Sequence, residues 1–178
     1  MADTKQDSPG GRLGLGMIIA AWVLALALLT FAFESHLSRD ANPNRNLKGL
    51  ITESGAREVV LERNRHGHYL AEGRINNETV TFIIDTGASD VSIPAHMAER
   101  LGLLPGQTIV YQTAKGRMEA SATRIRHLSL GTIEVERVRA SLNPYIEDDT
   151  ILLGMSVLQD LELEQRGTTL TLRQPPRY

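Results

Sequence analysis

The sequence predicts a mainly β domain with one or two short helices, preceded by a single N-terminal transmembrane helix. Two patterns carry this expectation. From about residue 57 onward, apolar and polar residues alternate with a period of two, and turn-forming residues separate the short runs. Residues 13–33, in contrast, form an apolar stretch without a single charged side chain.

Length, charge and composition narrow the possible functions. The 178 residues suffice for one domain with appendages. The formal net charge of −2 and the lack of a basic run argue against nucleic acid as a partner. The sequence contains no cysteine, which excludes disulfides, cysteine-based zinc sites and thiol nucleophiles but leaves the compartment open.

The N-terminal part divides into a tail and an apolar stretch. Residues 1–12 include Pro9-Gly10-Gly11 and are predicted to form a short disordered tail. Residues 13–33 match the length of about 20 residues that a spanning helix requires, so the lipid bilayer is an expected partner through this segment. A cleaved signal peptide is the alternative, although its apolar region is usually shorter. The bulky Phe31 and Phe33 favour an uncleaved anchor.

The rest of the chain is predicted to be a linker and one β domain. Residues 34–56 are polar, carry Asn42-Pro43-Asn44, and are predicted to tether the domain to the membrane. Residues 57–178 are predicted to form a closed or sandwich-like β domain. The clearest alternating runs are 79–84, 117–123 and 132–136, and the turn signals are Asn76-Asn77, Lys115-Gly116, Gly131 and Arg166-Gly167.

Two short helical pieces interrupt the predicted strands. Residues Pro94 to Leu101 have a proline at their start and Gly102 just past their end, as helices often do. Met155, Leu158 and Leu161 recur at helical spacing. Both segments are therefore expected to be short helices within the β domain.

The candidate site is the segment Ile83-Ile84-Asp85-Thr86-Gly87-Ala88-Ser89. A carboxylate at the end of a buried strand is costly unless it accepts hydrogen bonds, and Thr86 and Gly87 can supply them. Asp-Thr-Gly alone also fits an ordinary aspartate that opens a turn after a strand. Two further elements follow in order: a hairpin-like segment, Tyr111 to Arg117, and a second apolar run that reaches a glycine, Ile151 to Gly154.

This order of elements resembles the retropepsin-like aspartic proteases, in particular their single-domain, membrane-anchored bacterial members. The resemblance covers about Glu58 to Leu172 and implies a retropepsin-like closed β domain. It implies that Asp85 is the catalytic aspartate, with Thr86, Gly87, Ala88 and Gly154 as active-site support. The hairpin tip Ala114-Lys115-Gly116 corresponds to the flap that covers the cleft, although viral members have a more glycine-rich tip.

The chemistry of this family requires two carboxylates that share a water molecule. Asp-Thr-Gly occurs once in this chain, so the second carboxylate is expected to be Asp85 of another copy in a homodimer. Asp90 lies past the turn and is interpreted as a substrate-side or structural acid. Asp148 and Asp149 are not followed by Thr-Gly. The expected activity is aspartic endopeptidase activity on a protein or peptide substrate.

Localisation and alternative functions complete the expectations. Basic residues flank both ends of the apolar stretch, so the positive-inside rule does not decide its orientation. The resemblance favours a single-pass protein of the bacterial inner membrane with a periplasmic domain. A membrane-tethered peptide-binding or dimerisation module with little turnover is the main alternative. His66-Gly67-His68 has spacing suited to a metal, but a solvated turn is the preferred interpretation, and we expect neither metal nor cofactor.

Overall fold

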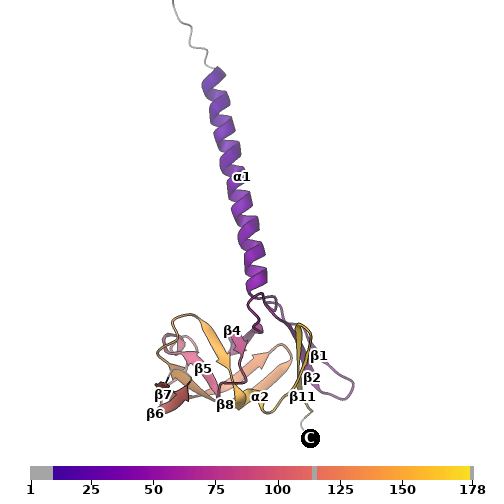
Figure 1. Cartoon of the computed structure of the whole chain (residues 1–178), viewed down its shortest axis with the longest axis vertical. Coiled ribbons are helices and arrows are strands. Elements are labelled where there is room, and N and C mark those ends of the chain that lie inside the picture. The colour runs from indigo at the N-terminus through magenta and orange to yellow at the C-terminus, as the bar shows by residue number, and fades with distance from the viewer. Residues whose placement is uncertain (1–9, 114–115, 177–178) are drawn as a thin grey trace, which may run out of the picture. The chain divides into compact units, whose positions relative to one another are not determined.

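The computed structural model describes the backbone of residues 10–113 and 116–176, and the side chains within these ranges except 10–15, 32–41 and 113. The chain divides into two compact units, Met1–Asp40 and Ala41–Tyr178. Residues 1–9 of the predicted tail lie outside the described part, and residues 10–12 belong to a helix. The second unit is the β domain (Figure 1).

The described part of the first unit belongs to helix α1 (Gly10–Ala41), whose described side chains are all exposed and whose last residue is counted in the second unit. No helix in the described part of the chain is long and apolar enough to cross a membrane. The predicted anchor over residues 13–33 therefore has no support from the structure. Part of that stretch, residues 13–15 and 32–33, has side chains outside the described ones.

The β unit contains two sheets. One sheet has the strand order β1-β2-β11-β10. Its strands are β1 (Gly49–Ile51), β2 (Arg57–Glu62), β11 (Thr169–Gln174) and β10 (Glu162–Arg166). The second sheet has the order β3-β4-β9-β5-β8-β7-β6. Its strands are β3 (Leu70–Ile75), β4 (Glu78–Ile84), β9 (Thr150–Leu153), β5 (Val91–Pro94), β8 (Ile133–Asn143), β7 (Gly116–Leu130) and β6 (Thr108–Thr113).

The larger sheet closes on itself, because β3 pairs with both β4 and β7. The closing pairs are Arg74 opposite Ser129 and Ile75 opposite Leu128. Two pairings in the sheet are parallel, β4 with β9 and β5 with β8. The predicted closed, mainly β domain is thus confirmed. Closure gives β3 a second neighbour, whereas β6 pairs only with β7 among the described strands and stays at an edge of the sheet.

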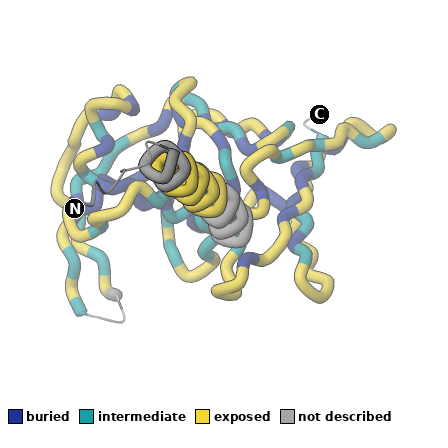
Figure 2. The backbone as a smooth tube through the Cα atoms, turned by 90° about the horizontal axis from the view of Figure 1, so that it is seen from above, coloured by how far each residue is buried: buried dark blue, intermediate teal, exposed yellow. Residues whose placement is uncertain are grey.

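The core consists of the inward-facing side chains of strands along which buried and exposed residues alternate. Figure 2 shows buried and exposed segments alternating along the backbone of the β unit. The fully buried side chains include Phe82, Ile93, Ile125, Leu128, Ile133 and Ile151. Each such side chain contributes about 1.5–3 kcal/mol through its removal from water. This core fixes β4, β5, β8 and β9, the strands on which the candidate site is built.

The predicted turn at Asn76-Asn77 joins β3 to β4. Ile75 pairs with Glu78, so these two asparagines form a two-residue hairpin loop. Their φ angles are +48° and +76°, and a tight hairpin needs such left-handed residues, which asparagine tolerates. The Asn76 side chain also donates to the Leu101 carbonyl at 2.9 Å. The alternation and turn chemistry of this region therefore predicted its structure correctly.

The structure differs from the prediction between Pro94 and Leu101. Pro94 ends strand β5, and only a 3₁₀ turn, η1 (Ala95–Met97), follows it. Gly102 adopts a φ of +63°, and the Leu103 amide bonds back to the Ala98 carbonyl, which ends the turn. The second predicted helical piece is α2 (Met155–Leu158).

The predicted linker over residues 34–56 is partly built into the β unit. Strand β1 pairs with β2 along Gly49 to Ile51. Asn44 is buried, and its side-chain amide donates to the carbonyls of Glu62 at 2.9 Å and Leu70 at 2.6 Å. One asparagine thus joins the ends of β2 and β3 through their backbone groups. The polar composition of this segment suggested a tether. Composition alone does not show that a polar side chain has hydrogen-bond partners in the backbone of other strands.

Candidate active site

Asp85 lies at the end of the innermost strands of the closed sheet. Strand β4 runs parallel to β9, with Ile84 opposite Leu153. The Asp85 amide donates to the Leu153 carbonyl at 3.1 Å, which continues this pairing by one residue. The carboxyl ends of the two apolar runs therefore meet at one edge of the sheet, and Asp85 and Gly154 lie there together.

The loop after β4 presents the Asp85 carboxylate to solvent. The Gly87 amide donates to Asp85 Oδ1 at 2.9 Å, and the Ala88 amide donates to the Asp85 carbonyl at 3.3 Å. Among the described residues, no donor contacts Oδ2. Asp85 is half-buried, whereas Thr86 and Gly87 are exposed. The chain thus holds one carboxylate oxygen and leaves the other open for water or a second protein group.

Gly154 lies directly behind this loop. A Cβ atom at position 154 would lie 2.2 Å from the Asp90 carbonyl oxygen and 2.6 Å from that of Ala88. The Met155 amide donates to the same Ala88 carbonyl at 2.8 Å. Gly154 has an extended backbone, with a φ of −99°, so close approach rather than backbone freedom requires glycine here. Strand β9 therefore supports the loop that carries Asp85.

Hollows lie on both sides of Asp85, which lines each of them together with Leu152. One hollow, of about 580 Å³, also includes His66, His68 and Asp148. The described residues contain no group of three or more His, Cys, Asp or Glu that could hold a metal ion. The other hollow has a volume of about 350 Å³.

The smaller hollow contains a hydrogen-bond network centred on Asp90. The Tyr111 hydroxyl donates a short hydrogen bond to Asp90 Oδ2, and the Ser141 hydroxyl donates to Asp90 Oδ1 at 3.1 Å. Burial, followed by the bond to the carboxylate, raises the pKa of Tyr111 to about 12. The sequence placed Asp90 on the substrate side or in a structural role, and the structure shows that its two oxygens bind β6 and β8.

Ser141 and Asn143 also line this hollow, and the sequence did not indicate them as site residues. Both are buried, at 1% and 6% exposure, and they lie two apart on β8. Their spacing places them on one face of the strand, and this was the available signal. They were missed because parallel pairing of β8 with β5, which buries them beside Ser92, cannot be read from local alternation.

Comparison with known proteins assigns the family. Residues 71–160 match the family described as gag-polyprotein putative aspartyl protease. The chain belongs to this family. It is also 32% identical to an uncharacterized protein from the cobV 5′ region of Sinorhizobium sp., over 91% of this chain and 75% of that one. An uncharacterized protein of Rickettsia prowazekii (strain Madrid E) is 30% identical, over 79% and 63%.

A solved structure extends this result to the fold. The crystal structure of a retropepsin-like aspartic protease from Rickettsia conorii superimposes with a TM-score of 0.56 and 27% identity. The match covers 72% of this chain and 96% of that protein. The predicted resemblance is therefore confirmed: this member of the aspartyl protease family has a retropepsin-like fold.

The predicted flap falls in the hairpin of β6 and β7. Thr113 pairs with Gly116, which has a φ of +113°. Ala114 and Lys115 of the predicted tip lie outside the described residues. Tyr111 of β6 and Met118 of β7 line the hollow that contains Asp85. The stem of the hairpin thus borders the site, as the flap interpretation requires.

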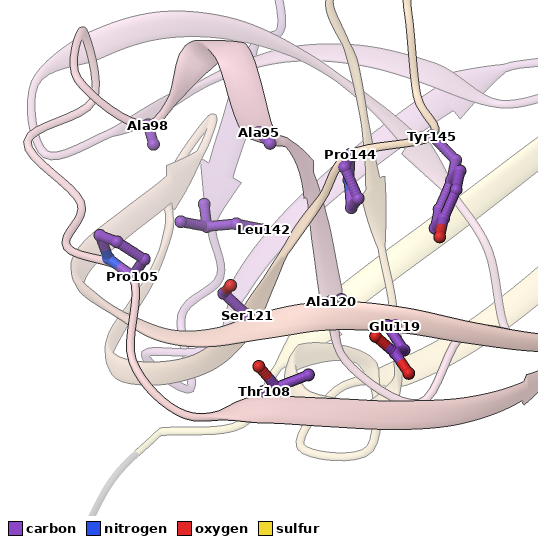
Figure 3. Close-up of a pocket in the computed structure, with 10 residues that line it drawn as sticks. All are labelled: Ala95, Ala98, Pro105, Thr108, Glu119, Ala120, Ser121, Leu142, Pro144 and Tyr145. Carbon is purple, nitrogen blue, oxygen red and sulfur yellow. The ribbon is translucent and has the colours of Figure 1, made fainter.

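A further hollow of about 430 Å³ borders the stem of the β6–β7 hairpin (Figure 3). Leu142 extends into it, between the 3₁₀ turn at Ala95 and the strand at Ser121. Leu142 alternates along β8 with Ser141 and Asn143, which line the hollow beside Asp85. Strand β8 therefore separates two hollows, and Asp85 lines only the one on the Ser141 face.

Proposed function

We propose that this protein is an aspartic endopeptidase that hydrolyses peptide bonds with water held between two Asp85 carboxylates of a homodimer. The observation that carries the proposal is the state of Asp85 in one chain. A backbone amide fixes one of its oxygens, the other is open, and hollows extend on both sides. The family and fold support peptidase chemistry at this position.

The reaction divides acid and base roles between the two carboxylates. One Asp85 is ionised and takes a proton from the water molecule, and the water oxygen attacks the peptide carbonyl carbon at the same time. The other, protonated, donates a hydrogen bond to the carbonyl oxygen and stabilises the tetrahedral intermediate. When that intermediate breaks down, the C–N bond breaks and the Asp85 that took the proton from water gives it to the leaving amine nitrogen. Two adjacent like charges resist full ionisation, so the pair retains one shared proton.

The other nearby acids of the same chain have different partners. Both oxygens of Asp90 accept hydrogen bonds, from Tyr111 and Ser141. Asp148 Oδ1 accepts a hydrogen bond from the Thr150 amide at 2.9 Å. Thr86 is exposed, and its hydroxyl makes no hydrogen bond among the described residues. A second copy across a twofold axis would supply both the missing carboxylate and a partner for Thr86.

We further propose that residues 13–33 anchor the protein in the bacterial inner membrane with the β unit in the periplasm. The support is the uncharged apolar sequence of this segment. Confinement of two copies to one membrane raises their effective concentration and favours pairing. Full-length protein should resist carbonate extraction, and external protease should digest its β unit in spheroplasts. Release as a shortened soluble product would instead indicate a signal peptide.

The competing proposal is a peptide-binding or dimerisation module of the same fold. A binding surface has no need of an open carboxylate, and this observation favours the enzyme. The test is Asp85→Asn, because a neutral amide cannot accept the proton of water. Hydrolysis of an unfolded protein by full-length enzyme should fall by about 10²–10⁴-fold or more, with thermal stability retained. Wild-type turnover by the variant would refute the aspartic mechanism.

A further inference from the structure

The hollow of about 350 Å³ beside Asp85 has buried polar side chains in its lining. Its floor is formed by Ser92, Ser141 and Asn143, which are only 7%, 1% and 6% exposed. Pockets for side chains are normally lined by apolar groups with few polar ones. Asp90 and Asp85 are both half-buried and line the same hollow. The pocket therefore suits a polar occupant.

The negative charge in this pocket has no counterion among the residues that the structure describes. Asp90 makes no ion pair among the described residues, and no Lys, Arg or His lines the hollow. Arg139 is close enough to lower the pKa of Tyr111, yet it is exposed and does not pair with Asp90. Partial burial of a carboxylate without a counterion is costly. A cation brought by the substrate would offset that cost.

The hydrogen-bond geometry leaves room for such a cation. Within the described part of the chain, each Asp90 oxygen accepts one bond, from Tyr111 or Ser141, although a carboxylate offers about four acceptor positions. The two neutral donors orient the carboxylate without cancelling its charge. Asn143, in turn, donates to Ser92 and to the Met118 sulfur, so the floor is already fixed. The pocket thus presents an oriented negative group.

We propose that this pocket binds a lysine or arginine side chain of the substrate next to the cleaved bond, with Asp90 as the residue that selects it. This inference rests on the proposed endopeptidase function and adds a substrate class to it. An amide side chain would satisfy the hydrogen bonds but leave the charge uncompensated. An aliphatic side chain would do neither, and it would also displace water from the polar floor.

The first experiment identifies the position. Full-length enzyme in detergent digests a mixture of peptides that retain internal Lys and Arg, and mass spectrometry locates the cleaved bonds. One position near the bond should be enriched in both basic residues. Matched peptides then carry arginine or its neutral isostere citrulline there. Replacement of arginine by citrulline should lower kcat/KM by about 10–100-fold, because the site then loses a charged hydrogen bond.

Three variants separate charge from position. Asp90→Asn should abolish the preference for arginine while the citrulline peptide is still cleaved. Tyr111→Phe removes the neighbouring hydroxyl but keeps the charge, and it should retain the preference. Asp149→Asn makes the same charge change at an exposed residue that pairs with His96 outside this pocket, and it should also retain the preference. Should Asp90→Asn fail to fold, the wild-type preference must still decrease as salt is raised.

Binding to the inactive Asp85→Asn protein tests the inference without turnover. The arginine peptide should bind about tenfold or more tightly than the citrulline peptide. Equal binding, or cleavage enriched in Asn or Gln instead of Lys and Arg, would overturn the basic-side-chain assignment while leaving Asp85-dependent hydrolysis intact. Persistence of the arginine preference in Asp90→Asn would overturn the role of Asp90. If the wild-type protein hydrolyses no peptide at all, that result contradicts the endopeptidase proposal, and the binding experiment still tests the pocket.

Discussion

At the scale of single residues, the site depends on close packing behind Asp85. The loop from Asp85 to Asp90 is held by backbone contacts with β9, and Gly154 provides the space for them. The Asp85 carboxylate has one fixed and one open oxygen. Its position is therefore set by residues that take no part in chemistry, and small displacements there should change the rate more than the fold.

Gly154→Ala tests this packing. The added methyl group would meet two backbone carbonyl oxygens at 2.2 and 2.6 Å, so the loop must move. We expect a loss of about 1–3 kcal/mol in the free energy of unfolding, measured in urea, together with a large decrease in kcat. Gly167→Ala is the control, because Gly167 has a φ of +59° in a turn with open space around it. That variant should lose stability but keep its rate per folded molecule.

The Tyr111 hydroxyl should keep its proton up to an unusually high pH. The pKa of Tyr111 is raised to about 12, first by burial and then by the bond to Asp90. The folded state therefore keeps a proton that the unfolded state releases near pH 10, so this contribution to stability is complete below about pH 10. It is lost as the pH rises toward 12. Absorbance titration at alkaline pH should show one late tyrosinate that Tyr111→Phe removes; an unchanged titration would contradict this assignment.

At the scale of elements, the hairpin of β6 and β7 borders the hollow through its stem. Tyr111 links that stem to the loop after β4 by its bond to Asp90. The hairpin is thereby tied to the segment that carries Asp85. Closure of such a hairpin over a peptide would exclude water and align its backbone.

Gly116→Val tests the flap function. Its φ of +113° is disfavoured for a β-branched residue, so the end of the hairpin must rearrange. Loss of a transition-state hydrogen bond costs about 2–4 kcal/mol, so kcat/KM for a long peptide should fall by about two to three orders of magnitude. The melting temperature should change little, because the hairpin end buries little apolar surface. Unchanged kinetics would mean that this hairpin does not cover the cleft.

The elements also show what the sequence could predict. Alternation and turn residues were sufficient for the hairpin at Asn76-Asn77, and the order of three motifs was sufficient for the family and fold. The polar floor at Ser141 required the β5–β8 pairing, which brings together residues far apart in sequence. The predicted boundaries of the linker were wrong for a similar reason, since Asn44 gains its partners from β2 and β3. The catalytic role of Asp85 stays a prediction.

At the scale of the whole molecule, one chain carries half of the proposed site. The unit Ala41–Tyr178 is compact, and it contains a single open carboxylate in the Asp-Thr-Gly context. Acid and base roles cannot both be filled by that one group. A monomer should therefore be inactive, whatever the affinity of the pair. Activity per molecule of a chain that begins at Ala41 should fall steeply when the protein is diluted below its dimer dissociation constant.

The most direct measurement mixes wild-type protein with an equal amount of Asp85→Asn protein and allows the subunits to exchange. If both carboxylates are required, only wild-type pairs are active, and random pairing leaves about one quarter of the activity of the same total amount of wild type. If each chain, or a pair such as Asp85 and Asp148 within one chain, were sufficient, about one half would remain. A result near one quarter is what the shared site predicts, and a result near one half would contradict it.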